Sequence, residues 1–470
     1  MVKRADSPKT SRTTPPGSIP AGGDPTPIEA ELIATLGPMS TWLKLAVGTL
    51  GAVVVAGVAA WIHQLRFGLS VTAMTDYFSW GIYIINFVFF IGISMAGTLI
   101  SAVLRLTGAE WRRPITRLAE GITVIALLLA ASMIIVDMGR PDRLLHIFAY
   151  GRLQSPILWD VLSLSTYLVG SVLYLYLALI PDLAILRDRG TAFPRWRRSL
   201  YTMLALSWKG TPEQHRRLER AISVMAIVII PVAISIHTVT AWLFGTTLRP
   251  GWQSTIIGPD FVVGALYSGT AAVLVTMALF RWMFRLERFI TIKHFQKLSL
   301  VLLVSCAAYT YFVVNEYLGP GYTRETVERH LLETIFRGSY AREFWGMAII
   351  GLVVPGVMLA LPGLRTIKGI ITASILVNIG MWLKRYVIVV PTLSMPFMPL
   401  QSTVGSQLSY IPTWVEWTIT ASAFAASCLF YIIFSKIFPI VSIWEVSEAA
   451  HERHATASTS KGEEDLSCAS

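Results

Sequence analysis

The stretch from Tyr77 to Leu104, YFSWGIYIINFVFFIGISMAGTLISAVL, contains no Asp, Glu, Lys or Arg. A helix rises about 1.5 Å per residue, so a run of this length exceeds the apolar thickness of a bilayer, which is about 30 Å. Inside lipid every backbone N–H and C=O group needs an internal partner, and a continuous apolar run meets this need as a helix. The stretch therefore predicts a membrane-spanning helix that tilts or extends past the surface.

Nine more runs along the chain have the same character. The ten predicted spans are residues 42–62, 77–104, 115–136, 157–180, 220–243, 259–284, 295–318, 345–361, 367–391 and 412–438. The span at 345–361 is short and contains Pro355. The pattern predicts an all-α polytopic membrane protein with ten transmembrane helices.

The composition agrees with a membrane protein. Of the 470 residues, 54% are hydrophobic and 14% are charged, whereas a soluble domain has about 25% charged residues. The three cysteines, Cys306, Cys428 and Cys468, are too few and too scattered for an iron–sulfur cluster or a zinc site. The net charge is +11. We expect the basic loops that produce it to face anionic lipid and not nucleic acid.

Lys and Arg are distributed unequally between the loops on the two sides. One set of loops holds 19 basic residues, at 105–117, 181–219, 281–297 and 362–369, and the opposite set holds 9, at 63–76, 138–156, 244–258, 319–344 and 392–411. The positive-inside rule makes the first set cytoplasmic. We therefore expect a multi-pass protein of the bacterial cytoplasmic membrane with both termini in the cytoplasm. The start does not resemble a signal peptide, because no apolar run follows Lys3 and Arg4 until about residue 45.

Two parts of the chain share features in the same order. Asp76 precedes Tyr83 by seven residues, and Asp260 precedes Tyr267 by seven. The helices that follow end in an acid and a glycine-containing turn, with Asp137 in the first part and Glu316 in the second. We expect two four-helix bundles, spans 2–5 and spans 6–9, flanked by helices 1 and 10. The predicted domains are a disordered cytoplasmic tail (1–38), the first helix with its outer loop (39–75), the first bundle (76–257), the second bundle (258–400), the last helix (401–447) and a second disordered tail (448–470).

Ionisable side chains of the predicted spans gather near their outer ends. A charge at membrane depth is costly unless it is paired or hydrated, so such residues are candidates for function. The set comprises Asp76, Asp137, Asp160, Asp260, Glu316, His237, Lys384 and Arg385, with His146 in the outer loop between spans 3 and 4. The structural alternatives are helix capping for Asp76, Asp160 and Asp260, a salt bridge to Arg140 or Arg143 for Asp137, a core position for His237, and extension to the interface for Lys384 and Arg385.

A cluster of histidine and carboxylate groups at one membrane face suits quinol chemistry. Oxidation of a quinol releases protons and electrons together, and each hydroxyl needs a proton acceptor within hydrogen-bond reach. The sequence therefore favours a quinone or quinol site at the outer depth. Arg385 would orient the quinone carbonyl or keep the acids ionised there.

Six motifs resemble the NrfD family, which comprises membrane subunits of the polysulfide reductase type: WGIY (80–83), GISMAGTLISA (92–102), WRRPITR (111–117), GRP (139–141), SPILWD (155–160) and LIPDLA (179–184). The resemblance runs from about residue 76 to about residue 400. With ten spans, the chain looks most like the ActC and ActF subunits of alternative complex III. The resemblance implies a subunit that binds quinone or quinol, either menaquinone or ubiquinone, and has no haem or iron–sulfur cluster of its own.

The resemblance also implies site residues and partners. It places the histidine and aspartate of the quinol site at His146 and Asp160, and the chain departs from ActC at Met95 and Asp137, where those chains tend to have histidine. The implied partners are an iron–sulfur, ferredoxin-like subunit and, in some complexes, a molybdopterin subunit, a multihaem cytochrome c or a second NrfD-like subunit. The predicted catalytic residues are His146, Asp160, Asp260, His237 and Arg385, and the predicted binding residues are His146, Asp160, Asp137 and Arg140.

Proton translocation is a further hypothesis, with Asp137, Glu316 and Glu120 as the predicted path. Its alternative is that polar residues in the spans hold neighbouring helices together. Two other functions remain open. A haem b anchor needs paired deep histidines, and only His237 lies deep, so a Soret band in the purified subunit would support that function. A stand-alone transporter suits duplicated bundles but predicts a charged site at the midplane.

Overall fold

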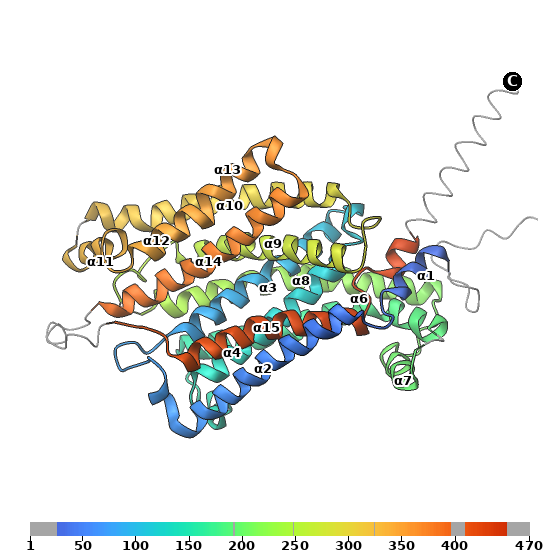
Figure 1. Ribbon diagram of the computed structural model, residues 1–470, viewed down its shortest axis with the longest axis horizontal. Coiled ribbons are helices and arrows are strands. Elements are labelled where there is room, and N and C mark those ends of the chain that lie inside the picture. The colour runs from blue at the N-terminus through green and yellow to red at the C-terminus, as the bar shows by residue number, and fades with distance from the viewer. Residues whose placement is uncertain (1–25, 191–192, 248, 324, 396–408, 449–470) are drawn as a thin grey trace, which may run out of the picture.

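The computed structural model describes residues 26–190, 193–247, 249–323, 325–395 and 409–448. Over these residues the chain is helical and contains no β-strand. The long helices run roughly parallel to one another (Figure 1). The all-α polytopic architecture predicted from the apolar runs is thereby confirmed.

Ten helices of the described residues are long and apolar enough to cross a membrane, as predicted. They are α2 (Thr41–Phe67), α3 (Ile82–Leu106), α4 (Thr116–Asp137), α6 (Pro156–Arg189), α8 (Pro212–Gly245), α9 (Ile257–Met283), α10 (Ile292–Thr323), the composite α12–α13 (Ala341–Ala348 and Val354–Ala360), α14 (Ile367–Ser394) and α15 (Trp414–Ile437). The shorter elements are α1 (Pro27–Ala34), η1 (Gly68–Val71), η2 (Glu110–Arg112), η3 (Pro141–Arg143), α5 (His146–Tyr150), α7 (Arg195–Leu204), α11 (Thr326–Phe336) and η5 (Pro362–Leu364).

Several helices extend past the apolar runs that predicted them. The run 157–180 lies in a helix that continues to Arg189, and the run 220–243 lies in one that begins at Pro212. A capping box between Thr211 and Gln214 fixes the second start. The apolar run marks only the part of a helix that lies in lipid, whereas backbone hydrogen bonding continues into the charged turns beyond it.

The short span with Pro355 is a helix interrupted by a π-helical segment, η4 (Ile349–Val353). Proline has no N–H for the carbonyl four residues back, which belongs to Gly351. The hydroxyl of Tyr267 on α9 donates to that carbonyl at 2.8 Å. A Cβ at Gly351 would lie 2.7 Å from the Cα of Gly380, so α14 crosses the interrupted helix in backbone contact. The two glycines permit this contact, and it buries the Gly351 side of the break against α14.

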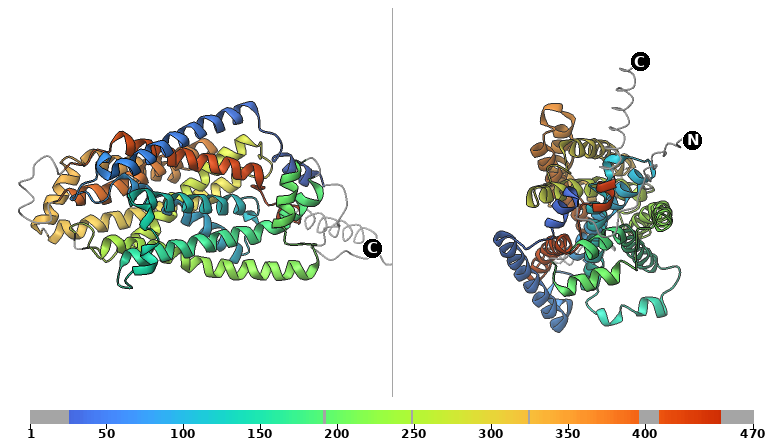
Figure 2. Two further views of the ribbon diagram at one scale, coloured as in Figure 1. Left: turned by 90° about the horizontal axis from the view of Figure 1, so that it is seen from below. Right: turned by 90° about the vertical axis from the view of Figure 1, so that its right-hand side faces the viewer.

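The helices pack as two groups with a shared seam. Helices α3, α4, α6 and α8 contact one another, as do α9, α10, α12–α13 and α14, and α3 packs along α9 between the groups. Helices α2 and α15 lie side by side against the first group (Figures 1 and 2). A Cβ at Gly269 of α9 would lie 2.6 Å from the Cβ of Ala96, so small residues let the seam close. The domain limits themselves remain predictions.

The predicted disordered tail 1–38 is wrong over its described part. Helix α1 follows Thr26, which forms a capping box with Glu29. The side chains of Leu32 and Leu36 are buried, and Glu29 forms an ion pair with Arg189 at the end of α6. The Pro-rich composition of residues 1–38 indicated disorder, so the sequence did not predict this short helix. The rest of this tail, and the predicted tail 448–470 apart from Glu448, lie outside the described residues.

Candidate functional site

Five ionisable side chains from four helices meet where the two helix groups join. Lys384 and Arg385 lie on α14, Asp260 in the first turn of α9, Glu316 two turns before the end of α10, and His237 two turns before the end of α8. Lys384 pairs with Glu316, Asp260 and Glu316 line one cavity, and Arg385 contacts Phe261, the neighbour of Asp260. His237 contacts the carbonyl of Ile91, and a Cβ at the next residue, Gly92, would lie 3.7 Å from Nη2 of Arg385. We call these five residues the junction cluster.

The Lys384 side chain is the most deeply buried cation of the cluster. It is 0% exposed and forms an ion pair with Glu316, whose side chain is 20% exposed. Its Nζ also donates to the hydroxyl of Tyr317 at 3.3 Å and lies 5.0 Å from the centre of that ring. Pairing of this kind is what allows a lysine to remain charged at membrane depth. The alternative that Lys384 extends to the lipid interface is therefore wrong.

Arg385 is buried with part of its hydrogen-bonding capacity unused. Its guanidinium carbon lies 5.4 Å from the centre of the Phe261 ring. Within the described residues, its Nε and Nη1 atoms have no hydrogen-bond partner, and the same holds for Asp260 Oδ1 and Tyr309 Oη. Buried polar atoms are nearly always satisfied, so unpartnered donors and acceptors at one place indicate a site for water or a ligand.

His237 bridges two helices through both ring nitrogens. Nδ1 lies 2.7 Å from the carbonyl oxygen of Ala233 on its own helix, and Nε2 lies 3.1 Å from that of Ile91 on α3. A neutral imidazole has one N–H and donates to one of these carbonyls at a time, whereas a protonated ring donates to both. His237 can therefore accept a proton and keep its position.

Asp160 lies near the start of α6, one helix away from the junction cluster. It is 4% exposed and accepts a hydrogen bond of 2.6 Å from the hydroxyl of Thr240. Thr240 lies three residues from His237 on α8, so one helix face carries a partner for Asp160 and a member of the junction cluster. The capping alternative is wrong for Asp160, because it lies inside the helix and Ser155 occupies the N-cap position.

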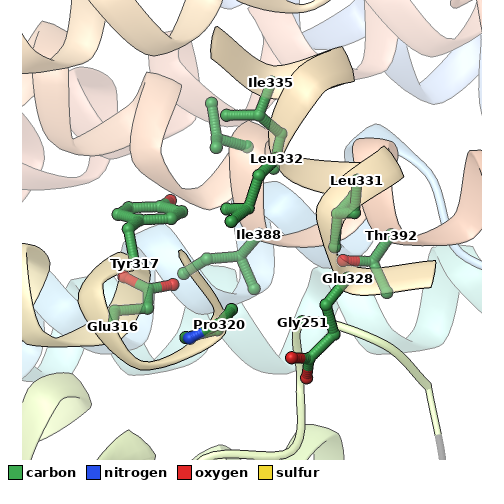
Figure 3. A pocket seen from close by; sticks show the side chains of 11 residues that line it. Gly251, Glu316, Tyr317, Pro320, Glu328, Leu331, Leu332, Ile335, Ile388 and Thr392 are labelled. Carbon is green, nitrogen blue, oxygen red and sulfur yellow. The ribbon is translucent and has the colours of Figure 1, made fainter. Parts of the chain in front are cut away.

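Two small cavities reach the junction cluster from the end of the helices at which α11 lies. One is lined by Glu316 and Tyr317 on α10, Leu331 on α11 and Thr392 on α14, with a volume of about 30 Å³ (Figure 3). The other is lined by both Asp260 and Glu316 and has a volume of about 10 Å³. Spaces of this size hold about one water molecule each. Glu316 lines both, so it connects the buried cluster to the space beside α11.

The structure separates other predicted site residues from this cluster. His146 is exposed on α5, where its ring lies 5.5 Å from that of Tyr150, and no hydrogen bond between described residues joins it to Asp160. Arg140 is also exposed and pairs with Asp142 at 3.1 Å. A quinol site formed by His146 and Asp160 therefore stays a prediction.

Asp137 and Glu316 are not equivalent, although the repeat pairs them. Asp137 ends α4, and its Oδ1 is buried without a partner among the described residues. Glu316 is paired with Lys384. The acids Asp76 and Asp260 also differ. Helix α9 begins ten residues before Tyr267 and therefore includes Asp260. Helix α3 begins only one residue before Tyr83, so Asp76 lies outside the helix and is exposed.

A second ionic cluster lies at the opposite end of the first group. Arg117 on α4 pairs with Asp182 on α6 at 3.0 Å, and both side chains are at most 2% exposed. Beside them Ser101 donates to Glu120 at 2.7 Å and lies 3.2 Å from the hydroxyl of Tyr174. The predicted path residue Glu120 is therefore buried among polar partners. The sequence did not predict the Arg117–Asp182 pair, although its residues stand in the motifs WRRPITR and LIPDLA.

The segment 438–448 after α15 closes this second ionic cluster. The backbone N–H of Trp444 donates to Asp182 at 3.0 Å. Glu445 forms salt bridges with Arg105 at 2.8 Å and Arg112 at 3.2 Å. Residues 440–447 are mostly buried. The last described residues are therefore a structural part of the first helix group.

Attachment of this segment is expected to depend on pH through Glu445. Burial opposes its ionisation, but the charges of Arg105, Arg112 and Arg117 outweigh burial and hold the pKa of Glu445 below its usual 4.5. A lowered pKa gives a stabilisation that is full above pH 4.5 and is lost as the pH falls through the lowered value. Glu445→Gln should therefore increase protease cleavage of 438–448 at pH 7. An equal cleavage rate in both proteins at pH 7 would contradict the role of the charge.

Within the described residues, no three His, Cys, Asp or Glu side chains are grouped to hold a metal ion.

The sequence matches the family described as polysulphide reductase, NrfD, over residues 70–396. It is 28% identical to a candidate dimethyl sulfoxide reductase membrane subunit of Halobacterium salinarum, covering 76% of this chain and 78% of that protein. It is 23% identical to a selenate reductase subunit of Mesobacillus selenatarsenatis (87% and 97% covered). It is 21% identical to the Hdr-like menaquinol oxidoreductase integral membrane subunit of Archaeoglobus fulgidus (86% and 95% covered).

The family match covers more than half of the chain, including the whole junction cluster and the helices that position it. The resemblance read from the six motifs is thereby confirmed. This multi-pass membrane protein belongs to the polysulphide reductase NrfD family.

Proposed function

We propose that this protein is the membrane subunit of a respiratory redox complex that binds quinone or quinol and exchanges electrons with an iron–sulfur partner. Two of its relatives are named as subunits of reductases, and a third is named as a subunit of a menaquinol oxidoreductase. A molybdopterin subunit, a multihaem cytochrome c and a second NrfD-like subunit are further candidate partners. We place the protein in a bacterial cytoplasmic membrane with both termini in the cytoplasm, on the basis of its basic loops.

The observation that supports this function is the set of unpartnered polar atoms at the junction cluster. Quinone oxygens accept hydrogen bonds, and Arg385 Nε and Nη1 are donors without a partner among the described residues. Quinol hydroxyls donate, and Asp260 Oδ1 is a similarly unpartnered acceptor. The chemistry of the cluster therefore fits both redox states of a quinone headgroup.

The space at the junction cluster is smaller than a quinone ring. The cavity between Asp260 and Glu316 has a volume of about 10 Å³, whereas ligand pockets have volumes of about 300 Å³ or more. Binding of the ring there requires the surrounding side chains to move apart. In the proposed reaction, His237 and Asp260 accept the protons of the quinol, and the electrons pass to the partner subunit.

The first test separates the two residues that the family resemblance pairs. If the quinol reacts at the His146–Asp160 pocket, Asp160→Asn lowers quinol oxidation by the purified complex about 100-fold, because the buried carboxylate is lost as a proton acceptor. If the quinol reacts at the junction cluster, Asp160→Asn keeps most of its turnover. His146→Ala should have the smaller effect, because His146 is exposed. Steady-state quinol oxidation measures both, and Thr166→Val on the exposed part of α6 is the control. Full turnover in both Asp160→Asn and His146→Ala would exclude the His146–Asp160 pocket and support the junction cluster.

We further propose that protons leave the junction cluster through Glu316. Glu316 lines two water-sized cavities at the outer end, and Glu120 and Asp137 are the other residues of the predicted path. Glu316→Gln is expected to reduce the number of protons released per electron in complex-containing liposomes. Asp137→Asn tests the acid that the sequence repeat pairs with Glu316. An unchanged ratio in both variants would assign these acids to helix packing.

A further inference from the structure

An apolar cavity lies on the other side of α3 from the junction cluster. Helices α3, α4, α9, α14 and α15 enclose it, and its volume is about 320 Å³. This volume falls within the range of ligand pockets, about 300–1,000 Å³. Nothing in the quinol chemistry proposed above uses this space.

Aromatic rings form part of the wall of the cavity. Phe424 of α15 lies 5.8 Å from Phe89 and 5.3 Å from Phe90, both on α3, and all three line the cavity. On the opposite face of the same turn of α3, the Ile91 carbonyl contacts His237. A planar aromatic ligand would find stacking partners here, separated from the junction cluster by one helix.

The cavity opens toward the lipid-facing surface between α14 and α15. Three apolar lining residues remain partly exposed in the membrane-spanning region, Leu279 at 39%, Ile379 at 48% and Phe424 at 37%. The two helices run along the same face of the protein (Figure 1). A lipophilic molecule can therefore enter from the bilayer without crossing a polar surface.

One lining residue provides an unused hydrogen-bond acceptor. Asn378 donates from Nδ2 to the carbonyl oxygen of Ser374 at 2.9 Å, and this contact fixes which side of the amide carries the oxygen. Its Oδ1 is buried and has no partner within the described part of the chain. An acceptor in apolar surroundings is costly unless a donor reaches it.

We propose that this cavity is a second binding site, for a prenylated quinol in its reduced form. A phospholipid acyl chain has no donor and a quinone has only acceptors, so neither satisfies Asn378 Oδ1. A quinol hydroxyl donates to it, its aromatic ring stacks on the phenylalanines, and its tail extends through the opening into the bilayer. This proposal rests on the proposed quinol function and adds a site that prefers the reduced form.

The test uses the full chain in nanodiscs of defined phospholipid. The probe is 2-heptyl-4-hydroxyquinoline N-oxide, which has an aromatic head, a hydroxyl donor and an alkyl tail, and its fluorescence is titrated. Asn378→Leu should weaken binding about 3- to 10-fold, the effect of one lost hydrogen bond. Ala272→Phe, which fills the cavity from a lining position, should abolish the part of this binding that persists in Arg385→Gln.

Two variants serve as controls. Asn315 donates to the Tyr311 carbonyl as Asn378 donates to that of Ser374, but it does not line the cavity, so Asn315→Leu should bind normally. Arg385→Gln should leave this site intact even where it stops turnover, which separates failure of this proposal from failure of the proposed function. Unchanged binding in Ala272→Phe would overturn the site. Unchanged binding in Asn378→Leu with loss in Ala272→Phe would overturn the quinol assignment and indicate an acyl-chain site.

Discussion

Replacing Arg385 by Gln is expected to lower quinol oxidation by the assembled complex about 100-fold or more. The guanidinium is buried between helices, and two of its nitrogen atoms have no partner among the described residues. A fixed donor aimed at the place where negative charge develops typically contributes about 100- to 1,000-fold to a rate. Glutamine keeps much of the length and polarity of the side chain but loses the charge. The effect should therefore appear in kcat more than in KM.

Arg385→Lys distinguishes the charge from the shape of the donor group. Lysine restores a positive charge without the planar fork of donors, so an intermediate rate is expected if orientation matters. Arg342→Gln changes an exposed arginine that is paired with Glu343 and is the matched control. Assembly is checked by co-purification of the partner subunits. A variant Arg385→Gln that assembles and retains most of its turnover would show that the junction cluster is structural.

The sequence predicted the helices well because membrane insertion leaves few alternatives. An uncharged run such as 77–104 has to satisfy its backbone internally, and only a helix does so within one segment. The errors lie where this constraint ends. Helix α6 continues to Arg189 and α1 forms within a Pro-rich tail. Both depend on capping and on tertiary contacts, such as the Glu29–Arg189 ion pair, which an apolar run does not encode.

Depth in the membrane was predictable, but contacts were not. Counting residues from the helix ends placed Asp260, Glu316, His237 and Arg385 at one depth, and the structure brings them together. The count gives the depth of a residue but not the direction in which its side chain points around the helix axis. It therefore did not separate Asp160, which bonds Thr240 on the neighbouring helix, from the junction cluster.

The second ionic cluster was not predicted from the sequence, for a related reason. Arg117, Asp182 and Glu445 stand near the ends of apolar runs, where charged residues are common and usually exposed. Their burial depends on the segment 438–448 folding back onto the first helix group. Contacts between positions so far apart in the chain leave no local pattern. The motif LIPDLA was identified only through the family resemblance. Its physical role is to supply Asp182, which pairs with the buried Arg117.

The Arg117–Asp182 pair should carry the largest stability effect in the protein. Asp182→Leu leaves the buried Arg117 without its counter-charge and is expected to lower the free energy of unfolding by about 3–5 kcal/mol. Arg117→Met should cost less, because Asp182 keeps the N–H of Trp444 and the hydroxyl of Ser442 as donors. Urea unfolding of the purified chain in mild detergent, followed by circular dichroism, measures both.

The double variant Arg117→Met with Asp182→Leu decides what the pair contributes. Removing both charges also removes the cost of burying either one, so the double variant should be more stable than Asp182→Leu alone. It should still release the segment 438–448 to protease, because Trp444 loses its acceptor. Stability as low as the sum of the two single losses would mean that the residues act independently. Recovered stability with a released segment would show that the buried pair serves to attach the C-terminal segment more than to hold the helices together.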